Sequence, residues 1–215
     1  MKKYALIVAS ATLLIACQNP PAGKNKDVLK REAGVERYDD VVAEGHHESA
    51  EKGAAEVKKD VDIDLNGLAL KGYENGLEAQ MITFLKSGAY KNAADDAALK
   101  DTWYNFDHVN FKMGSANQLE AGSEGQLENL AKILKAFPEA KIKIGAYTDK
   151  TGNDAANQKL SQDRANFIQS ELSKLGAGAQ VVSAEGYGSK YATVAKEASD
   201  EERAIDRKMS VRFSK

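Results

Sequence analysis

The stretch that decides the fold is Ile142-Lys143-Ile144-Gly145-Ala146-Tyr147-Thr148-Asp149, followed by the segment 153–175. Its first part alternates isoleucine with lysine, which is typical of a strand buried on one face. The segment that follows has helical spacing and stops at Gly176, a residue type common just after helix C-termini. The stretch therefore predicts a strand, a polar turn that contains Asp149, and a long helix.

One face of the predicted helix combines apolar and polar side chains. At about 100° per residue from Leu160, Arg164 falls at about 40° and Ile168 at about 80°, so the arginine lies inside the apolar arc. Asn157 falls in the same arc. Arginine is rarely buried without a partner, and its planar fork suits a carboxylate. Arg164 and Asp149 therefore predict a site for a zwitterion. Two structural alternatives stay open: an internal ion pair between these two side chains, or a turn capped by Asp149.

The segments around this stretch predict a small α+β domain. A strand is expected over 103–111, where aromatic residues and valine gather, and a helix is expected from the capping-box pattern of Ser123 and Gln126. Further strands are expected over 180–185 and 209–213. This order predicts helices on one side of a mixed sheet, which is an α+β two-layer sandwich.

Residues 61–101 predict a small unit in front of the main domain, which we place at 102–215. An alternating strand precedes the turn signal Asn66-Gly67, and a return strand and a helix that stops near Gly88 follow it. A hairpin with one helix is too small to fold alone. We therefore expect this unit to pack on the main domain.

Residues 1–16 have the features of an export signal. Lys2 and Lys3 precede an apolar run that is too short to span a bilayer and that ends in Leu14-Ile15-Ala16-Cys17. This ending resembles the lipobox of bacterial lipoproteins, which implies that Cys17 becomes the first mature residue, is multiply acylated and anchors the chain to a membrane. The chain has a single cysteine, so no intrachain disulfide can form.

Residues 17–60 are polar and contain few large apolar side chains, which predicts a flexible tether. The pair His46-His47 has no other ligand cluster nearby, so no metal site and no cofactor are predicted. A net charge of −2 gives no basic field, which argues against a nucleic-acid partner. His108 is the remaining histidine, so an enzyme would lack a zinc site or an activated nucleophile, and we predict that the chain is not an enzyme.

Many residues between 148 and 207 match one known pattern in order: Thr148-Asp149, Gly152, Asn157, Leu160-Ser161, Arg164-Ala165, Leu172, Gly176, Gly186-Tyr187-Gly188, Arg203-Ala204 and Arg207. Together they resemble the OmpA-like peptidoglycan-binding domain, and the resemblance covers 103–213. The βαβαββ sandwich of that family agrees with the order of elements predicted above. The chain departs from the pattern at Ala192, where a proline is usual, and at Asp206, where an asparagine is frequent.

The resemblance implies non-covalent binding of the peptidoglycan stem peptide. In this family Asp149 would take the ammonium and Arg164 the carboxylate of the amino-acid end of meso-diaminopimelate, and Thr148, Asn157 and Arg207 would be further contacts. With its lipobox and tether, the chain resembles a peptidoglycan-associated outer-membrane lipoprotein. Its domain would face the periplasm and link the membrane to the cell wall, with envelope proteins as further candidate partners. The alternative is a protein-interaction module on the same fold, with a weakened or lost peptidoglycan site.

Overall fold

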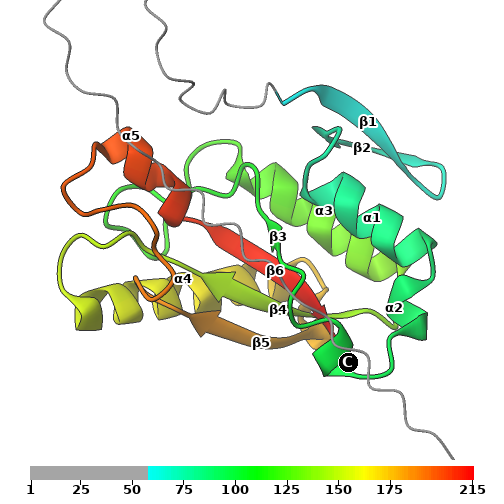
Figure 1. Ribbon diagram of the computed structural model, residues 1–215. Coiled ribbons are helices and arrows are strands. Elements are labelled where there is room, and N and C mark those ends of the chain that lie inside the picture. The colour runs from blue at the N-terminus through cyan, green and yellow to red at the C-terminus, as the bar shows by residue number, and fades with distance from the viewer. Residues whose placement is uncertain (1–57) are drawn as a thin grey trace, which may run out of the picture. The chain divides into compact units, whose positions relative to one another are not determined.

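A four-stranded mixed sheet forms the centre of the structure, a computed structural model that describes residues 58–215 (Figure 1). Its strands lie in the order β3 (Tyr104–Asn105), β6 (Met209–Ser214), β4 (Lys141–Ala146) and β5 (Val181–Gly186). β6 is antiparallel to both of its neighbours, and β4 and β5 are parallel. The last of these strands in sequence therefore lies inside the sheet.

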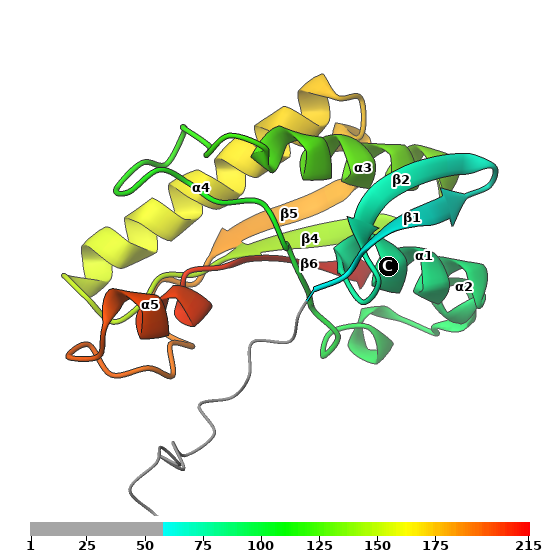
Figure 2. The same cartoon turned by 90° about the horizontal axis from the view of Figure 1, so that it is seen from above.

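Two helices, α3 (Ser123–Ala136) and α4 (Asp154–Lys174), cover one face of this sheet (Figure 2). Ile142 and Ile144 point into the layer between sheet and helices and are fully buried, whereas Lys143 between them is only partly buried, as alternation along a strand requires. The predicted α+β two-layer sandwich with a mixed sheet and βαβαββ order is confirmed.

The predicted long helix is confirmed as α4, and both of its ends have local causes. The side chain of Asn153 accepts two backbone N–H groups of the first turn. Gly176 follows the last turn with a φ of 80°, in the left-handed region that favours glycine. Further on, a Cβ added at Gly186 would lie 2.1 Å from the backbone nitrogen of Gln162, so the backbones of β5 and α4 touch at this glycine.

A hairpin and a helix precede the sandwich, as predicted. β1 (Asp60–Leu65) pairs with β2 (Leu68–Tyr73) across the Asn66-Gly67 turn, and α1 (Leu77–Lys86) follows and ends just before Gly88. The remaining short elements are α2 (Ala89–Asn92), α5 (Asp200–Arg203) and the 3₁₀ turns Asp96–Ala98, Gly178–Gln180 and Ala204–Asp206.

The hairpin–helix unit packs on the main sheet through aromatic side chains. Phe84 of α1 stacks on Phe213 of β6, with ring centroids 5.0 Å apart. The hydroxyl of Tyr90 donates to the carbonyl oxygen of Ser214 at 2.9 Å. The buried side chains of both regions form one core. A shared core does not mark where one domain ends, so the boundary placed between residues 101 and 102 stays a prediction.

The strand predicted over 103–111 is wrong in its length, because only Tyr104–Asn105 pairs with β6. After Phe106 the backbone leaves the sheet, and the N–H groups of Asp107 and His108 instead donate to the side-chain oxygen of Gln126 at 2.9 and 2.8 Å. Side-chain acceptors from α3 thus replace the β6 ladder as partners of this segment.

The predicted capping box is also wrong. The residue before α3 is Gly122, with a φ of 91°, and Ser123 is already helical. The Ser123 hydroxyl donates to the carbonyl oxygen of His108 at 2.9 Å and accepts the N–H of Asn110 at 3.1 Å. Both residues of the pattern therefore hold the segment 107–110 and do not cap their own helix.

Several predictions concern residues outside the described part of the chain. These are the export signal 1–16, the acylated Cys17, His46-His47 and almost all of the tether 17–60, whose last residue begins β1. Within residues 58–215, no helix combines the length and apolar character needed to cross a bilayer.

Candidate functional site

A cleft of about 480 Å³ lies beside the end of β4, where the chain leaves the sheet toward α4. Three parts of the chain form its walls: the segment 109–120, the turn after β4 with the first half of α4, and the segment 200–209. Every residue predicted for the site lines this cleft, namely Thr148, Asp149, Asn157, Arg164 and Arg207. The fold thus brings together side chains that are far apart in the sequence.

Asp149 is buried in the cleft wall with protein donors on both of its oxygens. Oδ1 accepts the backbone N–H of Thr151 at 2.9 Å and also its hydroxyl, and Oδ2 accepts Nη1 of Arg207 at 2.8 Å. The guanidinium Nε of Arg203 lies 3.6 Å from Oδ2. Burial raises the pKa of the Asp149 carboxyl, but the hydrogen bonds from Thr151 and Arg207 outweigh it and hold this pKa below its ordinary value. Asp149 is therefore an ionised carboxylate.

Arg207 bridges two carboxylates. Besides Asp149, it donates from Nη1 and Nη2 to the two carboxylate oxygens of Asp200, at 3.1 and 3.0 Å. Burial lowers the pKa of the Arg207 guanidinium, but the two acids outweigh it and raise this pKa. The bridge therefore ties α5 to the turn after β4, and both of these contribute residues to the cleft wall.

Arg164 contrasts with Arg207, because it has no carboxylate partner among the described residues. Its Nε donates to the carbonyl oxygen of Ser115 at 2.9 Å, and its guanidinium carbon lies 5.0 Å from the ring centre of Phe111. Burial, followed by the nearby charge of Arg207, lowers the pKa of Arg164. The arginine is thus oriented by a carbonyl and a ring, and it lies beside a second cation that adds to the attraction of an anion.

Of the two structural alternatives from the sequence, the internal ion pair between Asp149 and Arg164 does not form, whereas Asp149 does cap the turn by accepting the backbone N–H of Thr151. Within residues 58–215 the ion-pair partners of Asp149 are Arg203 and Arg207. Arg164 is partly buried and packs over the ring of Phe111, which agrees with the helical-wheel prediction that it lies toward the apolar face of the helix.

Thr148 and Asn157 hold the turn in shape. The Thr148 hydroxyl donates to the carbonyl oxygen of Asp149 at 3.1 Å, and its N–H donates to the carbonyl oxygen of Gly188 at 2.9 Å. The side-chain amide of Asn157 donates to the carbonyl oxygen of Thr151 at 2.8 Å. Both side chains therefore position Asp149 relative to α4.

Asp206, a departure from the family pattern, lies outside the cleft lining. Its buried carboxylate accepts the N–H groups of Thr193 and Val194, each at 2.9 Å to one of its oxygens. Burial raises the pKa of Asp206, but these backbone hydrogen bonds outweigh it and lower this pKa. The acid holds residues 193 and 194, which precede α5, through their backbone N–H groups.

Sequence reasoning missed several residues of the cleft: Phe111, Glu120, Asp200 and Lys208. Lys208 lies over the ring of Tyr147, with its nitrogen 5.4 Å from the ring centre. No spacing rule marks these positions, because they lie in irregular segments or, for Asp200, at the start of the short helix α5. Across residues 58–215, no group of three or more histidine, cysteine or acidic side chains is arranged to hold a metal ion.

Comparisons with known proteins match this region of the chain. The model of the OmpA family matches residues 110–207. Outer membrane porin F of Pseudomonas fluorescens is 35% identical over 91 residues, which are 42% of this chain and 28% of the porin. The probable lipoprotein YiaD of Escherichia coli is 31% identical over 107 residues, which are 50% of this chain and 48% of YiaD. The peptidoglycan-binding protein ArfA of Mycobacterium tuberculosis is 34% identical over 85 residues, which are 40% of this chain and 26% of ArfA.

The chain thus spans between about a quarter and a half of the length of these curated relatives. Among solved structures, the peptidoglycan-associated lipoprotein from Burkholderia pseudomallei is 29% identical, with a TM-score of 0.44 over 49% of this chain and 88% of that chain.

Proposed function

Because residues 110–207 are an OmpA-family domain, we propose that this chain binds the peptidoglycan stem peptide non-covalently, through the amino-acid end of meso-diaminopimelate. The observation that carries the proposal is the environment of Arg164. Its half-buried guanidinium lines the cleft and has no carboxylate partner among the described residues. A desolvated arginine without an ionic partner is costly, and a ligand carboxylate would supply that partner.

In this proposal Arg164 receives the carboxylate of the ligand, and Asp149 receives its ammonium. Thr148 and Asn157 keep the turn that carries Asp149 in place, and Arg207 holds the carboxylate of Asp149 through Nη1. Such a grip needs two opposite charges a fixed distance apart, so it favours diaminopimelate over lysine, whose side chain has the ammonium but no carboxylate.

We also propose that the chain is a lipid-anchored tether of the outer membrane, acylated at Cys17, with its binding domain in the periplasm. Support comes from the lipobox pattern and from relatives that include an outer membrane porin and a probable lipoprotein. A polar segment of about 40 residues can extend over 100 Å, which is enough to reach a wall at some distance from the membrane. Many copies acting together would make weak single contacts sufficient. Binding of this kind needs no turnover, so we propose no enzymatic activity.

A protein-interaction module remains the second candidate function. Two apolar side chains near the cleft favour it: Met113, which lines the cleft and is 94% exposed, and Ile205, which follows the lining residue Ala204 and is 69% exposed. Exposed apolar side chains at a rim are typical of protein contacts. In this case the cleft would bind a partner protein and would not bind muropeptides.

Calorimetric titration of the full chain with a diaminopimelate-type muropeptide tests the proposal. Saturable binding is expected, with much weaker binding of the lysine-type muropeptide and of the Arg164→Ala variant. Lys159→Ala is the matched control, because Lys159 lies on the same helix but pairs with Asp163 and does not line the cleft. Absence of binding by the folded wild-type chain would refute the proposal and favour the protein-interaction module.

A further inference from the structure

We infer that Glu120 is a second carboxylate for the ammonium of the ligand, and that it determines the preference of this cleft for zwitterionic over purely anionic ligands. This inference rests on the proposed function. It concerns a residue that lies outside the sequence pattern discussed above.

Asp149 alone is poorly suited to hold an ammonium. A carboxylate offers about four acceptor positions, and protein donors already occupy three of those of Asp149. Its negative charge is compensated by Arg207 at 2.8 Å and Arg203 at 3.6 Å. An ammonium group has three N–H donors, so it needs acceptors beyond the single position that remains on Asp149.

The charged side chains of the cleft divide into two groups. Asp149 and Asp200 each accept hydrogen bonds from Arg207. Arg164, Lys208 and Glu120 also line the cleft, and none of these three has an ionic partner among the residues that the structure describes. Glu120 is thus the cleft acid whose charge is left for a ligand.

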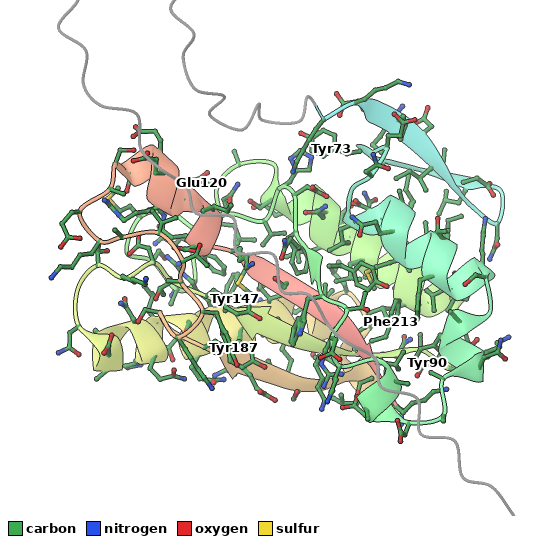
Figure 3. All side chains as sticks on the ribbon, viewed as in Figure 1. Tyr73, Tyr90, Glu120, Tyr147, Tyr187 and Phe213 are labelled. Atoms are coloured by element: carbon green, nitrogen blue, oxygen red, sulfur yellow. The ribbon has the colours of Figure 1, made fainter. Side chains whose placement is uncertain are left out.

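The backbone around Glu120 is held firmly although its side chain is exposed. Its N–H donates to the carbonyl oxygen of Asn110 at 2.9 Å, and its carbonyl oxygen accepts the N–H of Ser123 at 3.2 Å. One residue earlier, Leu119 forms an antiparallel bridge with Phe111. Figure 3 shows Glu120 at the same end of the sheet as Tyr147, which also lines the cleft. The carboxylate therefore extends from a fixed point of the cleft wall.

The charges of the cleft explain why such an acid matters. The cations Arg164, Lys208 and Arg207 line the cleft. They repel an ammonium that enters it, and they attract a carboxylate. Glu120 offsets this repulsion for a ligand that carries both charges. For a ligand that carries only carboxylates, the same side chain adds repulsion. Glu120 thus raises the affinity for the zwitterionic ligand and lowers the affinity for the anionic one, which increases specificity.

A two-by-two binding experiment with the full chain tests this assignment. The proteins are wild type and Glu120→Gln, which keeps size and polarity and removes the charge. The ligands are a stem peptide with meso-diaminopimelate and the same peptide with 2-aminopimelate, which keeps the terminal carboxylate and lacks the ammonium. We expect Glu120→Gln to weaken diaminopimelate binding by about two- to fivefold, the range of an exposed charge-assisted contact. Binding of the 2-aminopimelate peptide should stay equal or become tighter.

Glu124→Gln is the matched control. It removes the same charge four residues further on, in the first turn of α3, and Glu124 does not line the cleft. It should change neither affinity, which separates a local contact from the general field of the protein. Equal weakening of both peptides by Glu120→Gln would overturn the inference, and so would the absence of any effect. If wild type binds neither peptide, the proposed function itself fails, and the inference fails with it.

Discussion

Asp149 is predicted to stabilise the fold as well as to bind ligand. Its side chain is 7% exposed, and it accepts two hydrogen bonds from Thr151 and one from Arg207. Replacement by alanine removes all three. It also removes the carboxylate that lies 3.6 Å from the Nε of Arg203, a buried atom without a hydrogen bond, and leaves Arg203 with Asp200 as its ion-pair partner. Loss of one partner from a buried charged pair costs about 3 kcal/mol, partly offset here because Arg207 keeps Asp200. We expect Asp149→Ala to lower the free energy of unfolding by about 2–3 kcal/mol at pH 7.

The dependence on pH gives this prediction a second, independent check. The pKa of Asp149 is lower in the folded protein than in the unfolded chain. The contribution of the carboxylate is therefore fully present above about pH 4 and is lost as the pH falls through the folded-state pKa. The difference between wild type and Asp149→Ala should shrink when both are measured at about pH 3.

Urea unfolding followed by circular dichroism at both pH values measures these differences. Asp163→Ala is the control, because Asp163 forms an exposed i,i+4 pair with Lys159 whose loss should cost less than about 0.5 kcal/mol. A cost below about 0.5 kcal/mol for Asp149→Ala at pH 7, or a larger cost that does not change with pH, would refute the reasoning. The result also decides how binding data are interpreted, since a destabilised variant loses ligand for two reasons.

Three further predictions follow from other parts of the structure. Gly186→Ala should destabilise the protein by about 3 kcal/mol in thermal unfolding, because the new Cβ would overlap the α4 backbone. Gly125→Ala is the control in an open position of α3 and should stabilise the protein by about 0.5–1 kcal/mol. Equal effects of the two changes would contradict the close approach of Gly186 to α4. Asp96→Ala should cost about 2 kcal/mol in urea unfolding, because the buried Arg212 loses a two-point ion pair; a change under 0.5 kcal/mol would show that water replaces the acid. Arg164→Ala should make muropeptide binding much weaker in calorimetry yet cost less than about 1 kcal/mol of stability, because the protein loses one hydrogen bond. A large loss of stability would assign Arg164 a structural role.

The sequence was most informative where a pattern is local and periodic. The alternation of Ile142 and Ile144 predicted β4, and Asn153 and Gly176 marked the ends of α4, because each signal depends on neighbours along the chain. The strand over 103–111 failed for the opposite reason. Its aromatic residues suit a strand, but Gln126, a residue of α3, provides the acceptor that turns the backbone away. No local rule contains that contact.

The candidate site was predictable in its members and less so in its pairing. Helical geometry alone placed Arg164 and Asn157 on the inner face of α4. It could not show that Asp149 pairs with Arg207, which is 58 residues away, and not with Arg164. Glu120 has neither periodicity nor a motif, so only the folded cleft identifies it.

The position of β6 has a consequence for how the protein is made. This strand comes last among the strands of the sheet, yet it lies between β3 and β4. A growing chain that has reached β5 therefore has β4 with one unpaired edge, and it lacks Val211 and Phe213 of the core. Unpaired edges and open cores attract other chains and proteases. The domain can close only after β6 has joined it, so a chain released between β5 and β6 cannot assemble this sheet, whatever the quality of its binding residues.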